Sequence, residues 1–113
     1  MKIEISSQGV ALDEKLQRHI ARQIEFGLGR LASHIRKVTV RLSDVNGPRG
    51  GVDQHCQLVI SLHQIPDVII EDVATDQLFA INRATDRASR TVSRRVRQSR
   101  GFAPVASPLG LGY

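Results

Sequence analysis

The chain has 113 residues, of which 41% are hydrophobic, a formal net charge of +5 at pH 7 and one cysteine, Cys56. This length suits a single domain with a hydrophobic core of its own. The single cysteine excludes an internal disulfide, so the chain is not one of the small domains that depend on disulfides for stability. The opening MKIEIS lacks the pattern of a secretory signal, and no apolar run approaches the roughly 20 residues of a bilayer span. We therefore expect a soluble, cytoplasmic protein.

Positive charge is concentrated at one end of the chain. Residues 1–76 contain nine Lys or Arg and ten Asp or Glu, whereas residues 77–113 contain seven Arg and one Asp. Such asymmetry indicates a nucleic acid or another acidic surface as partner, more than a general need for solubility.

A strand and a helix are predicted first. Residues 2–6 alternate between apolar and polar side chains, as a half-buried strand does. Asp13 is expected to cap a helix whose apolar positions recur every three or four residues, namely Leu16, Ile20, Ile24, Leu28 and Leu31. Gly27 and Gly29 weaken the last turns, so this helix should loosen or end within residues 26–32.

A hairpin and a short strand follow. Residues 36–45 and 53–63 alternate in the same way and are joined by the turn-forming NGPRGG, which carries Arg49 as an exposed cation. A turn at 64–67 then leads to a fourth strand at 68–73. One face of the third strand should stay in water and is a candidate surface for weak self-association; its residues are His55, Gln57, Val59, Ser61 and His63.

A second long helix should begin at Asp76, or at Thr75 beside it, and run to about Gln98. The uncharged residues 101–113 are expected to be a flexible tail after a domain of residues 1–100. The order β-α-β-β-β-α predicts a two-layer α+β fold, with a four-stranded sheet and both helices packed on one face. The first and second strands should be parallel neighbours or near-neighbours.

The second helix separates charge from apolar side chains. At about 100° per residue, five arginines share a sector roughly 80° wide, and we call them the arginine stripe: Arg83, Arg87, Arg90, Arg94 and Arg97. The opposite side is apolar: Leu78, Ile81, Thr85, Ala88, Val92 and Val96. Asp86 alone should offset the stripe locally, and the planar guanidinium fork suits phosphate.

Two interpretations of the stripe compete. It is typical of a surface for a polyanion, but a solvated helix face in a genome rich in G and C gives many arginines too. Apart from Asp86, acidic residues are missing from this helix only, which favours the functional interpretation. Even so, the polyanion is either a nucleic acid or an acidic protein.

No catalytic, metal or cofactor site is expected. His55 and His63 lie eight residues apart on one strand, about 26 Å, too far to bind one ion. Cys56 alternates in phase with core residues, and Glu71 and Asp72 should point to opposite faces of their strand. The spacing brings together no nucleophile, base and oxyanion site, so an enzyme, and with it a small-molecule substrate, is the least favoured class.

Three stretches resemble the ribosome hibernation-promoting factor family, also called the ribosome-associated inhibitor or sigma-54 modulation protein family. They are MKIEISSQGVALDEKLQRHI, KVTVRL and DVATDQLFAINRATDRASRTVSRR. The segment DQLFAIN at residues 76–82 is similar to the family's Asp-hydrophobic-aromatic-x-Ala-Ile-Asp helix opening.

The resemblance implies a fold like that of double-stranded-RNA-binding domains and a place in the messenger and transfer RNA channel of the small ribosomal subunit. There the protein would inhibit translation in starved cells. Contacts of the family with rRNA come from basic residues on both helices, which implies Arg18 and Arg22 on the first helix and the arginine stripe on the second. The alternative is a protein-interaction module that docks its arginine face on an acidic partner.

Overall fold

The structure is a computed structural model that describes residues 1–44 and 54–102. Within these ranges the elements are β1 (Lys2–Gln8), α1 (Glu14–Leu28), the 3-10 helix η1 (Gly29–His34), β2 (Ile35–Asp44), β3 (Gln54–Leu62), β4 (Val68–Ala74) and α2 (Gln77–Phe102). The predicted order is confirmed, with η1 added after α1. The predicted NGPRGG loop with Arg49, and the predicted tail from residue 103 on, lie outside the described residues.

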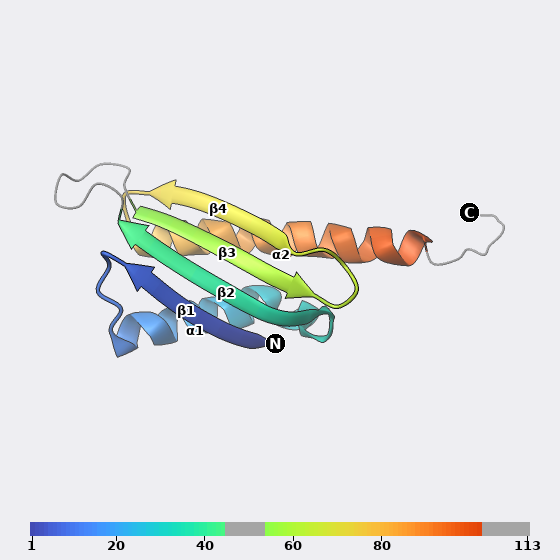
Figure 1. Ribbon diagram of the computed structural model, residues 1–113, viewed down its shortest axis with the longest axis horizontal. Coiled ribbons are helices and arrows are strands. Elements are labelled where there is room, and N and C mark those ends of the chain that lie inside the picture. The colour runs from blue at the N-terminus through green and yellow to red at the C-terminus, as the bar shows by residue number, and fades with distance from the viewer. Residues whose placement is uncertain (45–53, 103–113) are drawn as a thin grey trace.

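The four strands form one sheet in the order β1-β2-β3-β4 (Figure 1). β1 is parallel to β2, as predicted, and β3 is antiparallel to both of its neighbours. The register sets Val40 opposite Leu58 and Leu58 opposite Ile70, and all three are buried. Because side chains alternate between the faces of a strand, this register gathers the apolar residues on one face of the sheet.

Both helices cover that apolar face, so the fold has two layers. In Figure 1, α1 lies behind β1 and β2, α2 lies behind β3 and β4, and the other sheet face is open. The last turns of α2 run past the end of the sheet, and Val96 is the last buried residue among the helix side chains that the structure describes, up to residue 99. The predicted two-layer α+β architecture is confirmed.

α1 begins and ends as its sequence predicts. The side chain of Asp13 accepts a hydrogen bond from the Leu16 backbone N–H at 2.8 Å, which satisfies one of the free donors of the first turn. Ile20, Ile24 and Leu28 are buried in the core. The α-helix ends at Leu28, and the chain tightens into η1 from Gly29 on.

α2 begins as predicted, but it ends later than predicted and one side chain of its first turn is not in the core. Asp76 caps it as expected, because its side chain accepts from the Leu78 N–H at 3.4 Å, but the helix continues beyond Gln98 to Phe102. Leu78, predicted to face the core, is 38% exposed. Leu78 lies in the first turn, beside the N-terminal end of α1, and the core contact of α2 begins two residues later with the buried Ala80.

Gly27 allows the two helices to approach each other closely. A Cβ atom at this position would lie 2.5 Å from the Cγ2 atom of Thr85 on α2. Carbon atoms that are not bonded to each other prefer separations of about 3.5–4.0 Å, so no other residue fits here without movement. The sequence indicated only a weakened helix at Gly27, whereas the structure gives this glycine a role in packing.

Candidate nucleic-acid interface

The arginine stripe does not form one uniform row of free cations. Arg83, Arg87 and Arg90 each lie within 4 Å of a carboxylate of the same chain. Arg94 and Arg97 are exposed and make no ion pair or hydrogen bond with the part of the chain that the structure describes. The free positive charge of α2 therefore lies toward its C-terminal half.

Asp72 holds the first two arginines, and we call Asp72, Arg83 and Arg87 the Asp72 clamp. The Asp72 side chain, 3% exposed, accepts from Arg83 Nη2 at 2.8 Å and from Arg83 Nε at 3.1 Å. Arg87 Nη1 lies 3.7 Å from the same carboxylate. On α2 itself Asp86 offsets the stripe locally, as expected, through its pair with Arg90. The contribution of Asp72 was not foreseen, because it comes from β4, which α2 crosses.

The clamp also closes the outer edge of the sheet. β4 is an edge strand, and the Glu71 carbonyl accepts from Arg87 Nη1 at 2.7 Å. The Val73 N–H donates to Asp72 Oδ1 at 2.9 Å. Edge strands with free backbone groups invite pairing with another chain, so these side chains block part of that edge. Arg83 and Arg87 are still about half exposed, and their remaining N–H groups face solvent.

α1 adds cations in the same layer as α2. Lys15, Arg18, His19 and Arg22 surround a shallow hollow of about 420 Å³ on its outer side. Arg18 Nη2 pairs with Glu14 Oε1 at 3.0 Å, an exposed pair worth only a few tenths of a kcal/mol. Arg22 has no ion-pair partner within residues 1–44 and 54–99.

Arg30 connects η1 to α2 and was missed by the sequence analysis. Its Nη2 atom donates to the hydroxyls of Ser89 and Ser93 on α2, at 3.2 Å each. The guanidinium therefore lies across the boundary between η1 and α2. We call the combined surface the cationic face; its residues are Lys15, Arg18, Arg22, Arg30 and the arginine stripe.

Among the described side chains, two aromatic ones are exposed on this side of the molecule and were also missed. Phe26 on α1 is 88% exposed, and Phe79 on α2 is 52% exposed with the Arg83 guanidinium 5.2 Å from its ring centroid. Phe26 lies two residues, or about 200°, from the buried Ile24. An aromatic residue out of phase with the apolar period was the signal that the sequence offered.

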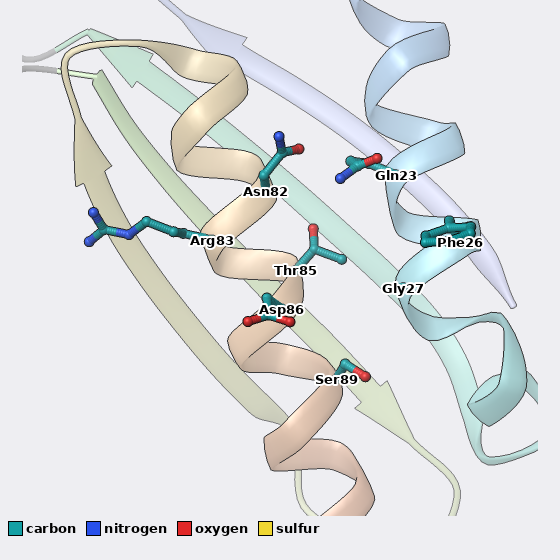
Figure 2. A pocket seen from close by; sticks show the side chains of 8 residues that line it. All are labelled: Gln23, Phe26, Gly27, Asn82, Arg83, Thr85, Asp86 and Ser89. Atoms are coloured by element: carbon teal, nitrogen blue, oxygen red, sulfur yellow. The ribbon is translucent and has the colours of Figure 1, made fainter.

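A groove separates α1 from α2, and we call it the interhelical groove. Its volume is about 410 Å³, and it is lined by Gln23, Phe26, Gly27, Asn82, Arg83, Thr85, Asp86 and Ser89. Figure 2 shows Gln23 extending from α1 toward α2 and Asn82 projecting from α2 into the same gap. Arg83 turns away toward β4 (Figure 2), consistent with its bonds to Asp72.

Among the residues that the structure describes, no three His, Cys, Asp or Glu side chains are grouped so that they could hold a metal ion. Burial, helped by the negative charge of Asp72, raises the pKa of the Cys56 thiol to about 12. His55 Nε2 lies 3.6 Å from Glu71 Oε1 on the open sheet face. Self-association through that face remains a prediction. Of the residues predicted for that surface, His63 lies just after the end of β3.

The fold and the distribution of charge define a small two-layer α+β protein with a cationic helical face. The chain matches, over residues 3–100, the family described as "Sigma 54 modulation protein / S30EA ribosomal protein", and it belongs to that family. The family resemblance found in the sequence is thereby confirmed. No curated protein matches the chain.

Solved structures share the fold at low sequence identity. The Thermus thermophilus Protein Y N-terminal domain has a TM-score of 0.67 and 19% identity, over 83% of this chain and 98% of that chain. A ribosomal subunit interface protein from Coxiella burnetii has a TM-score of 0.70 and 11% identity, over 86% of this chain and 99% of that chain. At such identities the likeness shows the fold alone. Across the described residues, no helix has the length and hydropathy of a bilayer span.

Proposed function

We propose that this protein binds rRNA of the small ribosomal subunit through its cationic face and inhibits translation in stationary phase or under stress. Family membership supports a ribosomal role in the cytoplasm, and one structural neighbour is named as a ribosomal subunit interface protein. The observation that carries the proposal is the placement of unpaired cations on two helices of one layer, with Arg22 on α1 and Arg94 and Arg97 on α2.

The arginines have different parts in this proposal. Arg94 and Arg97 are free to pair with phosphates and release counterions, so they supply most of the salt-dependent affinity. Arg83 and Arg87 are held by Asp72, so they offer ordered N–H donors but less net charge. Recognition of phosphates and of RNA shape carries little sequence information, and the folded rRNA supplies the selectivity. Occupying the RNA channel suffices for inhibition, and no catalysis is required.

A charge reversal on each face of the molecule tests the proposal. Arg94→Glu changes the cationic face, whereas Arg41→Glu makes the same change in charge on the open sheet face, where Arg41 is exposed. Both variants should fold normally. In sucrose gradients at low salt, the wild type and Arg41→Glu should migrate with small subunits, and Arg94→Glu should bind several-fold more weakly.

Salt dependence provides the second measurement. The logarithm of the affinity should fall linearly with the logarithm of the salt concentration. The slope for Arg94→Glu should be shallower than that of the wild type by the equivalent of about one phosphate contact or more. A wild-type protein that never migrates with small subunits in dilute buffer would overturn the proposal. That result would favour the alternative, in which the same arginines dock on an acidic protein.

A further inference from the structure

We infer that the interhelical groove takes one unpaired nucleobase of the bound RNA, with adenine preferred. The inference rests on the proposed function, because the cationic face would bring the RNA strand to the groove. It adds a base-specific contact to a surface that otherwise recognises phosphates.

The lining of the groove fits a base better than a phosphate. Of the described residues that line it, Arg83 alone is cationic, and its guanidinium is turned toward Asp72. Asp86 adds a carboxylate, which Arg90 Nη1 contacts at 2.9 Å from outside the groove lining. Within the lining the Asp86 carboxylate disfavours a phosphate, but it can accept a hydrogen bond from an exocyclic amino group.

The floor and the rim of the groove carry apolar groups. At the floor Gly27 packs closely against Thr85, which presents its methyl group there because its hydroxyl donates to the Ile81 carbonyl at 2.7 Å. Phe26 stands at the rim and is the most exposed large hydrophobic side chain of the described residues. An exposed aromatic ring beside cations offers a stacking surface for an unstacked base.

Two amides provide the polar contacts. Gln23 and Asn82 enter the groove from opposite helices (Figure 2), and neither makes a hydrogen bond with the rest of the described chain. Side-chain amides pair with the adjacent donor and acceptor of adenine through two hydrogen bonds. Arg30 on η1, which contacts Ser89 of the lining, and Arg90 on α2, which contacts Asp86, lie beside the groove, where they can contact the phosphates on either side of the base.

The test compares RNA probes that differ in one base. The probes are fluorescent 12-nucleotide RNAs of uridine that carry adenosine, uridine or an abasic site at the centre, read by anisotropy at constant salt. Because the number of phosphates is nearly constant, the cationic face contributes equally to all three. The wild type should bind the adenosine probe about fivefold or more tightly than the abasic probe, the equivalent of one stacked base.

Single variants locate the effect. Phe26→Ala and Asn82→Ala should bind all three probes with nearly the same affinity, and both side chains are exposed, so the fold should survive. Phe79→Ala removes the other aromatic side chain that is exposed in the described part of the chain, which lies outside the groove, and should keep the preference for adenosine. Arg94→Glu should weaken all three probes by one common factor.

The outcomes separate this inference from the proposed function. Equal binding of the three probes, or no binding of any, overturns the nucleobase site, while migration with small subunits judges the proposed function independently. A uridine preference overturns the assignment of adenine. If Phe26→Ala reduces migration with subunits although the probes bind equally, the groove takes a protein side chain and the inference is wrong.

Discussion

Replacement of Gly27 by Ala should destabilise the protein, although alanine is the better helix former. In an open helix this change would add up to about 1 kcal/mol to the free energy of unfolding. Here the new Cβ atom would lie 2.5 Å from Thr85 Cγ2, and Thr85 is buried and bonded to the Ile81 carbonyl. Overpacking of this kind costs about 1–3 kcal/mol, so we expect a net loss of about 1–2 kcal/mol.

Urea unfolding and thermal melts measure this loss. For a domain of this size, 1 kcal/mol shifts Tm by roughly 4–8 °C. Gly29→Ala is the matched control, because no atom lies within 4 Å of its added Cβ and its backbone is already helical, with φ −58° and ψ −38°. It should raise stability by about 0.5–1 kcal/mol.

A double-mutant cycle identifies the cause. Thr85→Ser removes the Cγ2 atom and keeps the hydroxyl, so it should make Gly27→Ala much less harmful, with a coupling energy of about 1 kcal/mol. If Gly27→Ala is as stable as the wild type, or if Thr85→Ser gives no relief, the close contact between the helices is not what limits this position.

Three further predictions concern other parts of the fold. Asp72→Asn should release the clamp and open the β4 edge beside the exposed Ile69, so the mass in sedimentation equilibrium should rise with concentration; a strictly monomeric variant would contradict this. Gln64→Gly should raise the free energy of unfolding by about 0.5–1 kcal/mol, because Gln64 has φ 62°, a left-handed conformation that strains residues other than glycine. A variant that unfolds at lower urea concentration than the wild type would show that this strain is not what the substitution relieves. Cys56 should resist thiol reagents in the native state, since its pKa is about 12 against an ordinary 9.0. The raised pKa of the Cys56 thiol stabilises the folded state in full below pH 9, and this contribution is lost as the pH rises toward 12. The free energy of unfolding of Cys56→Ala should therefore decline less steeply above pH 9 than that of the wild type.

The local rules of the sequence predicted the elements well. The cap at Asp13, the spacing of Ile20, Ile24 and Leu28, and the strand alternation each involve residues close together in the chain. The end of α2 was predicted at about Gln98, before the uncharged residues 101–113, whereas the helix continues to Phe102.

The candidate site was less predictable, because it depends on how the layers meet. Helix angles placed the arginine stripe correctly around the axis of α2, but they could not show that Asp72 lies beneath Arg83. Arg30 reaches residues 59 and 63 positions away, a contact that no local pattern encodes. Phe26 gave a visible signal, but its meaning required the groove beside it.

The C-terminal end of α2, which runs past the end of the sheet, has a consequence for how the protein binds a polyanion. The side chains of residues 97–99 are all exposed, and Arg94 and Arg97 repel each other one turn apart. We expect such an end to fray and reform without disturbing the rest of the domain. A polyanion that neutralises these arginines would stop the fraying, so the ligand itself would complete the last turns, and protection of their amides from hydrogen exchange would then report occupancy.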